Sequence, residues 1–202
     1  MRTITKAMQF IEMQARHFNL NSKQLYSQTK SLLMLYRNVV WSVKNRANNL
    51  QSEIAGTYGM QLNTALLYLS DFAPERAKED FEITVSNLFQ SHWLIKLIDL
   101  ALRYVYDYPI YGDTYASILK FRFLEEAKRN DSTVSKMLSL ERSTYYDRKK
   151  ESILLLGVSL WGFVIPNALA TYKRIAYLNV SEDDFFNRVS MEQNKQKLNL
   201  GP

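Results

Sequence analysis

The chain has 202 residues, of which 47% are hydrophobic and 23% are charged, and its formal net charge is +6. This length can bury a substantial core, and this composition excludes a disordered chain. The absence of cysteine excludes disulfides, thiol catalysis and thiolate metal sites, and it favours a cytoplasmic location.

The charges are unevenly distributed. Residues 1–50 hold eight Lys or Arg and a single acid, Glu12, whereas residues 51–110 hold four bases and eight acids. Residues 142–150 hold four bases and one acid, Asp147. Two basic regions on either side of an acidic middle favour nucleic acid as a partner, and a solvated helix surface is the alternative interpretation of the N-terminal excess.

The N-terminal part predicts long helices. Thr3 or Thr5 is expected to cap a first helix that ends near Phe18, and 19–21 should break it. Ser22 is expected to cap a long periodic segment over 23–54. Basic residues recur in this segment every seven positions and form one stripe along it: Lys23, Lys30, Arg37 and Lys44. The stripe fits a phosphate backbone, or equally the solvated face of a dimer helix.

The middle of the chain continues the helical pattern. Gly56 and Gly59 should end the long helix, a short helix is expected over 62–69, and Pro74 should open the next one. Residues 76–106 are apolar on several sides in their second half, which predicts a helix in the centre of the fold. Residues 107–112 should form a hinge before a helix over 114–128.

Residues 131–156 predict two helices joined by a tight turn. Asp131 or Ser132 should cap the first helix. Residues 139–140 interrupt the period, and Glu141 or Ser143 should cap the second helix. The side chains expected on the buried face of the second helix are Tyr145, Ser152, Ile153 and Leu156. The opposite face carries Arg142, Ser143, Thr144, Tyr146, Asp147 and Lys150. This pattern is typical of a helix-turn-helix.

The most apolar run covers 153–165 and is 13 residues long, which is shorter than the ~20 residues that a membrane-spanning helix needs. The run contains Gly157 and Gly162 and is expected to stop at Pro166, so it predicts one buried helix or two short ones, and no membrane partner. Asn167 should then cap a helix to about residue 178, another should begin at 181–184, and 188–202 should fray. No alternating strand pattern and no internal repeat is visible, and we expect an all-α protein.

The residue types that carry catalysis are poorly arranged. His17 and His92 are far apart in the sequence, and neither has a carboxylate at helical spacing. The acidic run 182–184 is better explained as a helix start than as a cation site, because ligand loops need alternate spacing and a turning glycine. No phosphate-cradling loop, serine elbow or nucleotide fingerprint is present. We therefore expect no enzymatic activity, no cofactor and no metal.

The string LSLERSTYYDRKKESILLL, and within it the RSTYY-x-x-KK segment of Arg142 to Lys150, resembles the helix-turn-helix of ArpU-type transcriptional regulators of phages and prophages. It is also similar to region 4 of sigma factors. The preceding GDTYASILKFRFLEE, residues 112–126, resembles the helix that those regulators place before the motif. The resemblance covers roughly residues 98–157. It implies that the second helix enters the DNA major groove.

By this resemblance the base-facing residues are Arg142, Ser143, Tyr146 and Asp147, with Thr144, Lys149 and Lys150 near phosphates. The physical reading agrees, because a helix fits the major groove, arginine bonds guanine bidentately and lysine meets phosphate as a point charge. Residues 1–110 would form an oligomerisation or partner-binding region, 111–165 the DNA-binding region and 166–202 C-terminal helices with a frayed tail.

The expected function is a sequence-specific, DNA-binding transcriptional regulator that acts as a homo-oligomer, most simply a dimer, with RNA polymerase as a further candidate partner. Two alternatives stay open. One is a phage DNA-packaging subunit that recognises its genome, and the other is a helical adaptor or antirepressor that binds protein and no DNA.

Overall fold

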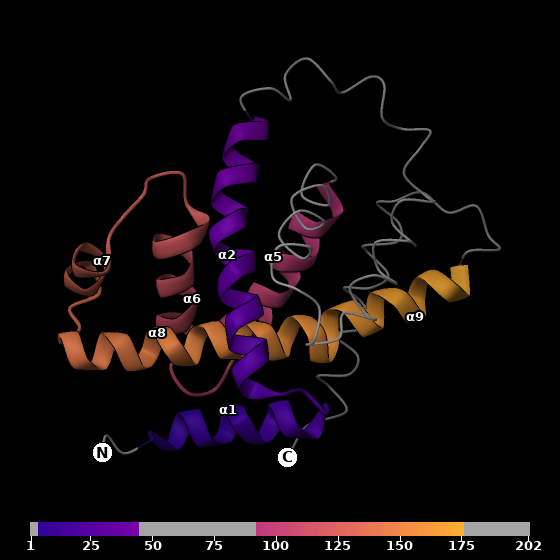
Figure 1. Ribbon diagram of the computed structural model, residues 1–202, viewed down its shortest axis with the longest axis horizontal. Helices are drawn as coiled ribbons and strands as arrows, with labels where there is room; N and C mark the ends of the chain where they lie inside the picture. Colours follow the sequence, from indigo (N-terminus) through magenta and orange to yellow (C-terminus); the bar gives the residue numbers. More distant parts are fainter. Residues whose placement is uncertain (1–3, 45–91, 176–202) are drawn as a thin grey trace.

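The structure is a computed structural model that describes residues 4–44 and 92–175. The chain is all-α, and no strand occurs within these two ranges. One long helical run dominates the arrangement (Figure 1): α8 (Arg142–Gly157), the π-helical segment η3 (Val158–Val164) and α9 (Ile165–Ile175) follow one another directly. The run is roughly 50 Å long at 1.5 Å per residue.

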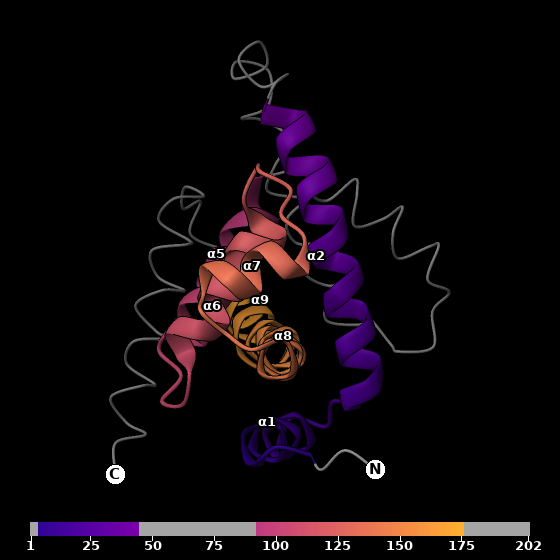
Figure 2. The ribbon, with the colours of Figure 1, turned by 90° about the vertical axis from the view of Figure 1, so that its left-hand side faces the viewer.

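The second half of α8 is the centre of the core. Every residue from 151 to 160 is buried. A helix that is buried on all sides must have neighbours all around it, and α1 (Lys6–His17), α2 (Ser22–Lys44), α5 (His92–Tyr106) and α6 (Gly112–Leu119) surround α8 when it is viewed end-on (Figure 2). The prediction of a buried helix within 153–165 is thereby confirmed.

The helix expected in the centre of the fold, at 76–106, is described only from His92 onward, as α5. Its buried face packs on the helical run that follows α8, but Asp99 and Arg103 leave an exposed edge. α5 is therefore a wall of the core and not its centre. The expectation was wrong because Asp99 and Arg103, four residues apart, share one edge of α5 that stays exposed, whereas every residue from 151 to 160 is buried.

The first helix confirms its predicted bounds and cap. Thr5 precedes α1, and its hydroxyl accepts a hydrogen bond from the Met8 amide at 3.1 Å. The cap of α2 differs from the prediction, because the side chain of Asn21, and not Ser22, accepts bonds from the amides of Lys23 and Gln24, at 3.1 and 3.2 Å. An asparagine just before the helix can reach two first-turn amides, as this residue type does at N-caps.

α2 crosses α8 at a glycine. A Cβ atom placed on Gly157 would lie 2.4 Å from Oγ1 of Thr29 and 2.9 Å from Cγ of Leu25. The two helices can approach this closely because the residue in α8 has no side chain. The contact sets the crossing point of the upright α2 and the horizontal α8 in Figure 1.

The predicted basic stripe along α2 is only partly present. Lys23 and Lys30 are exposed, and the side chain of Lys44 lies outside the described part. Arg37 instead turns inward, and its guanidinium donates to the backbone carbonyls of Arg122 and Glu125 at 2.8 and 3.2 Å. Those carbonyls lie at the end of the π-helical segment η2 (Lys120–Leu124), so Arg37 satisfies groups that a helix end leaves unpaired.

The helix predicted over 114–128 begins two residues earlier, at Gly112, and ends four residues earlier, at Leu124, after its last turns become π-helical in η2. It starts at Gly112, where a Cβ atom would lie 2.2 Å from the carbonyl oxygen of Tyr106. Only glycine fits between the end of α5 and the start of α6, so the turn at 107–111 folds back tightly. The helix α7 (Asp131–Met137) follows η2 after a short connection.

Pro166 does not end the apolar helix, contrary to the prediction, and Asn167 lies inside α9 and is not its cap. The turn before the proline is π-helical, with the Ile165 amide bonded to the Leu160 carbonyl, five residues back. A proline in a helix lacks one amide and clashes with the carbonyl four residues before it. The wider π turn shifts those carbonyls, so the helix continues.

Within the described part, Arg142–Thr171 is long and apolar enough to cross a membrane by length and composition alone. Sixty-one per cent of its most apolar window is buried among the other helices, and a core helix meets the same criteria. The predictions at 45–75, at residue 178 and at 181–202 fall outside the described residues.

Candidate functional site

The α7–α8 unit consists of two helices joined by a short turn, and it lies at one end of the molecule. Asn130, and not the expected Asp131 or Ser132, caps α7, because its side chain accepts from the amide and hydroxyl of Thr133 at 2.8 and 3.0 Å. The aspartate one residue later is thereby released for another role.

The turn between α7 and α8 has a defined backbone course. Ser139 adopts a left-handed conformation with φ of 53°, and the amide of Leu140 bonds to the carbonyl of Ser135 at 3.0 Å. This six-to-one bond is the mark of a Schellman ending, which reverses the chain within a few residues. α8 then begins at Arg142, and Glu141 occupies the cap position without a side-chain bond to the helix.

A small apolar cluster holds the two helices together. Tyr145 of α8 and Val134 of α7 are fully buried, and Ile118 of α6 completes the cluster. Tyr145 therefore lies on the inner face, as its spacing predicted. Tyr146, the next residue, is 42% exposed, which also agrees with the prediction.

Asp131 ties α7 to the rest of the fold. Its carboxylate accepts from Lys149 Nζ at 2.8 Å to each oxygen, from Arg122 Nε at 2.8 Å and from the Tyr145 hydroxyl at 2.9 Å. Burial alone would raise the pKa of Asp131, but these hydrogen bonds outweigh burial and hold the pKa below its ordinary value. The same contact raises the pKa of Tyr145, after the larger effect of burial.

Two of the four bases in 142–150 are engaged inside the protein. Lys149, which was expected near a phosphate, keeps only 15% of its side chain exposed in its ion pair with Asp131. Arg148 pairs with Glu151 at 2.6 Å, and its guanidinium lies 3.5 Å from the centroid of the Tyr111 ring. The role expected of Lys149 was wrong because spacing along one helix cannot reveal a partner on another, here Asp131 of α7. Arg148 entered the sequence analysis only through the charge of the window, and its partner Glu151 lies on the same helix.

Glu151 was missed by the sequence analysis. Its side chain is fully buried, and it accepts from the Tyr115 hydroxyl at 2.8 Å, from Arg148 and from the Thr5 hydroxyl. Burial, followed by this bond to Glu151, raises the pKa of Tyr115. Thr5 also caps α1, so one carboxylate links the start of α1 to α6 and α8. Little in the sequence signals this role, because Glu151 lies between Lys150 and Ser152, where the charged part of the helix meets the apolar part.

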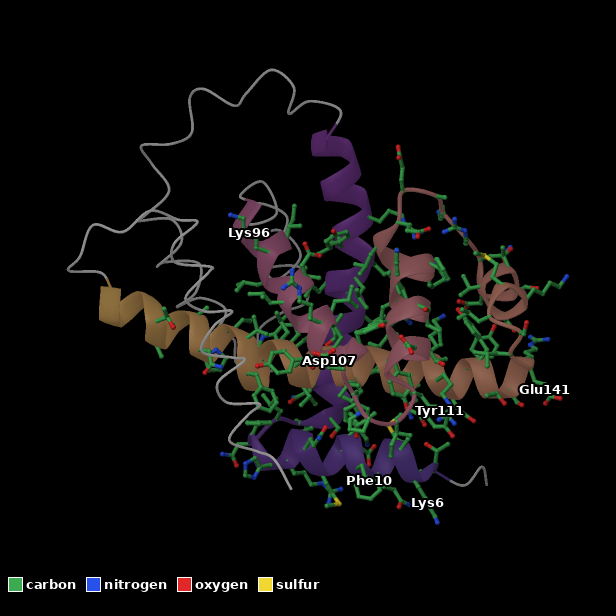
Figure 3. The ribbon with its side chains drawn as sticks, turned by 180° about the vertical axis from the view of Figure 1, so that it is seen from behind. Lys6, Phe10, Lys96, Asp107, Tyr111 and Glu141 are labelled. Atoms are coloured by element: carbon green, nitrogen blue, oxygen red, sulfur yellow. The ribbon has the colours of Figure 1, made fainter. Side chains whose placement is uncertain are left out.

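The outward face of α8 therefore consists of a smaller set than predicted. Arg142, Ser143, Tyr146 and Lys150 are exposed, and Thr144 and Asp147 are half-buried. Figure 3 shows that Glu141, which immediately precedes them, lies at the extremity of the molecule below α7. The structure brings this face together on one rigid helix whose other side is anchored by Asp131, Tyr145 and Glu151.

The described residues contain no group of three or more His, Asp or Glu arranged to hold a metal ion. His17 is exposed and its ring meets that of Phe18 edge-on, whereas the side chain of His92 lies outside the described part. Comparison of the chain with models of protein families, with curated proteins and with solved structures found no match.

Proposed function

We propose that the chain is a sequence-specific DNA-binding protein, a transcriptional regulator of the phage or prophage type, which inserts the start of α8 into the major groove. The observation that carries the proposal is the division of the 142–150 segment into two faces. Asp131, Tyr145 and Glu151 hold the inner side rigidly, and Arg142, Tyr146 and Lys150 project from the outer side at the end of the molecule.

The outer residues have the chemistry that duplex DNA requires. An arginine on the first turn can bond O6 and N7 of guanine together, and this pair discriminates against a wrong base by about 1–3 kcal/mol. Lys150, two turns later, suits a phosphate on the groove edge. The N-terminus of α8 favours a second phosphate through the helix dipole.

The rigid anchoring matters for specificity. A side chain reads a base edge only if its helix is held in one position, because a loose helix would spread the same contacts over several registers. Two features provide that restraint. The turn at Ser139 lies just before α8, and the Asp131–Lys149 pair holds the middle of the helix. Lys149 thus contributes by fixing α7 and not by meeting phosphate.

One helix-turn-helix buries too little area for a specific site, so the protein should act as a dimer on paired half-sites. No cofactor is needed for such binding. A contact between the N-terminal helices and RNA polymerase would couple binding to transcription in the cytoplasm.

The test is the salt dependence of duplex binding, measured by fluorescence anisotropy for four proteins. Lys150→Ala should lower the slope of log K against log salt by about 0.9, the value for one lost phosphate contact. Arg142→Ala should narrow the ratio of specific to random affinity by roughly tenfold. Lys120→Ala, an exposed lysine on η2, is the matched control and should behave as the wild type.

Failure of the wild type to shift any duplex at low salt would contradict the proposal, because even non-specific cationic binding is strong there. That outcome would favour the alternative function, a helical adaptor that binds protein and no DNA. A ring-shaped assembly that binds DNA would select the packaging subunit.

A further inference from the structure

The turn between α1 and α2 follows the same backbone course as the turn between α7 and α8. Asn19 has a φ of 56° and Ser139 a φ of 53°, and each is the second residue after its helix ends. The amide of Leu20 bonds to the carbonyl of Ala15 at 2.9 Å, and that of Leu140 to Ser135 at 3.0 Å. Both helices therefore end in the same Schellman geometry.

The following helices also begin alike. The Leu25 amide bonds to the Asn21 carbonyl at 2.8 Å, and the Tyr145 amide bonds to the Glu141 carbonyl at 2.8 Å. Leu25 and Tyr145, the fourth residues of α2 and α8, are both buried. The sequence shows no repeat because only a few aligned residues are identical, among them Leu20 with Leu140, Tyr26 with Tyr146, Lys30 with Lys150 and Leu35 with Leu155.

The outer face of α2 is polar and basic from Lys23 to Lys30, whereas α1 exposes Phe10 and Met13. Lys23, Ser27 and Lys30 are exposed on the side of α2 that lies opposite Leu25 and Thr29. The sequence holds no acid between Glu12 and Glu53, so no carboxylate on α2 opposes these ammonium groups. Tyr26 departs from its counterpart because it packs against the main core, so the second face offers charge and small polar groups and no exposed ring.

We propose that the α1–α2 unit is a second contact for duplex DNA, in which Lys23 and Lys30 meet phosphates of a segment separate from the one held by α8. The inference rests on the proposed function of α8. A polyanion is the fitting occupant because this exposed face carries two cations and lacks an acid.

The two contacts lie on helices that cross one another. In Figure 1 α2 stands upright in front of the horizontal α8, and Figure 2, turned by 90°, shows α2 to one side of the end-on α8. The exposed side of α2 points away from α8, whereas α8 begins at the extremity of the molecule. In this proposal one protomer joins two segments of DNA, instead of making a longer contact with a single segment.

The test is a bridging assay with the full chain at physiological salt. An unlabelled duplex is immobilised, protein is bound and washed, and a second, fluorescent duplex of the same sequence is then added. The wild type should retain the second duplex. The double variant Lys23→Ala/Lys30→Ala should bind the immobilised duplex within about twofold of the wild type, but it should capture at least about fivefold less of the second duplex.

Two further variants of the protein show which of the two faces holds each duplex. Lys120→Ala, which removes an exposed lysine of η2 that belongs to neither unit, should bridge as the wild type does. Arg142→Ala/Lys150→Ala should also stop bridging, and it should lose sequence preference as well. If only this α8 variant loses bridging, two α8 faces of an oligomer hold the two duplexes. The α1–α2 unit then has no contact with DNA, and the inference is wrong.

A wild type that binds one duplex and never captures a second would also overturn the inference, and it would leave the proposed function of α8 intact. Conversely, if the α8 variant binds and bridges normally while the α2 variant does not, the function proposed for α8 fails. The two-contact arrangement then fails with it, because the α1–α2 unit alone holds the DNA. Circular dichroism melting of each variant should match the wild type, because all substituted residues are exposed.

Discussion

Asp131 and Lys149 are 18 residues apart in the chain, yet both carboxylate oxygens of the first lie 2.8 Å from Nζ of the second. The pair joins the first residue of α7 to the middle of α8. It fixes the angle at which the exposed face of α8 leaves the protein. It also removes Lys149 from the surface that we propose for DNA.

The neighbouring lysines offer a matched comparison. Lys149→Ala should lower the free energy of unfolding by about 1–3 kcal/mol, because Asp131 keeps its burial and loses one of the two cations that pair with it. Lys150→Ala should change it by less than about 0.5 kcal/mol, since Lys150 is exposed. Urea unfolding of both variants measures the difference. Equal stabilities would mean that the Asp131–Lys149 pair contributes nothing to the fold.

The lowered pKa of Asp131 predicts a pH dependence of known sign. The unfolded chain, with a pKa near 3.9, binds the proton more readily than the folded one, so the contribution of Asp131 is present above about pH 4. It is lost as pH falls through the folded pKa. Asp131→Asn should therefore be less stable than the wild type at pH 7, and the gap should shrink in urea titrations below about pH 4. A gap that stays constant down to pH 2 would contradict the role of the carboxylate.

Substitution of Gly157 by alanine should cause a steric clash that outweighs the gain in helix propensity. In an open helix Gly→Ala stabilises by roughly 0.5–1 kcal/mol. Here the new methyl group would lie 2.4 Å from Thr29 Oγ1, so Gly157→Ala should destabilise by about 1–3 kcal/mol. Thr29→Ala removes that oxygen, and the double variant should recover part of the loss in thermal melts. Strict additivity of the two substitutions would argue against direct contact.

The two left-handed turn residues give a graded test. Serine is strained at the positive φ of Ser139, so Ser139→Gly should stabilise the protein by roughly 0.5–1 kcal/mol. Asparagine tolerates this region better, so Asn19→Gly should give a smaller gain. Melting temperatures of both variants measure the two gains. A loss at residue 139 would show that its hydroxyl, and not its backbone, matters in the turn.

Periodicity predicted much of this fold correctly. The all-α class, the capping role of Thr5, the buried Tyr145 beside the exposed Tyr146 and the mostly buried helix over 153–165 all follow from the sequence of single helices. Such features depend on which face a residue occupies, and one helix determines that by itself.

The predictions that were wrong concern residues whose partners are distant in the sequence. Asp131 looked like a helix cap because residue type and position allowed it, but its hydrogen bonds come from Arg122, Tyr145 and Lys149. Arg37 looked like a surface cation, but the carbonyls that it meets lie at the end of η2. The continuation through Pro166 depends on a π turn, which leaves no local sequence signature.

The central claim is that the outer face of α8 reads duplex DNA, and selection of bound fragments from a random duplex pool tests it most directly. The wild type should enrich one short motif, repeated as paired half-sites if the protein is a dimer. Arg142→Ala should bind with the enrichment lost at one position of each half-site, and Lys150→Ala should enrich the same motif more weakly. A pool that stays random after repeated rounds, or an Arg142→Ala profile identical to that of the wild type, would contradict the account.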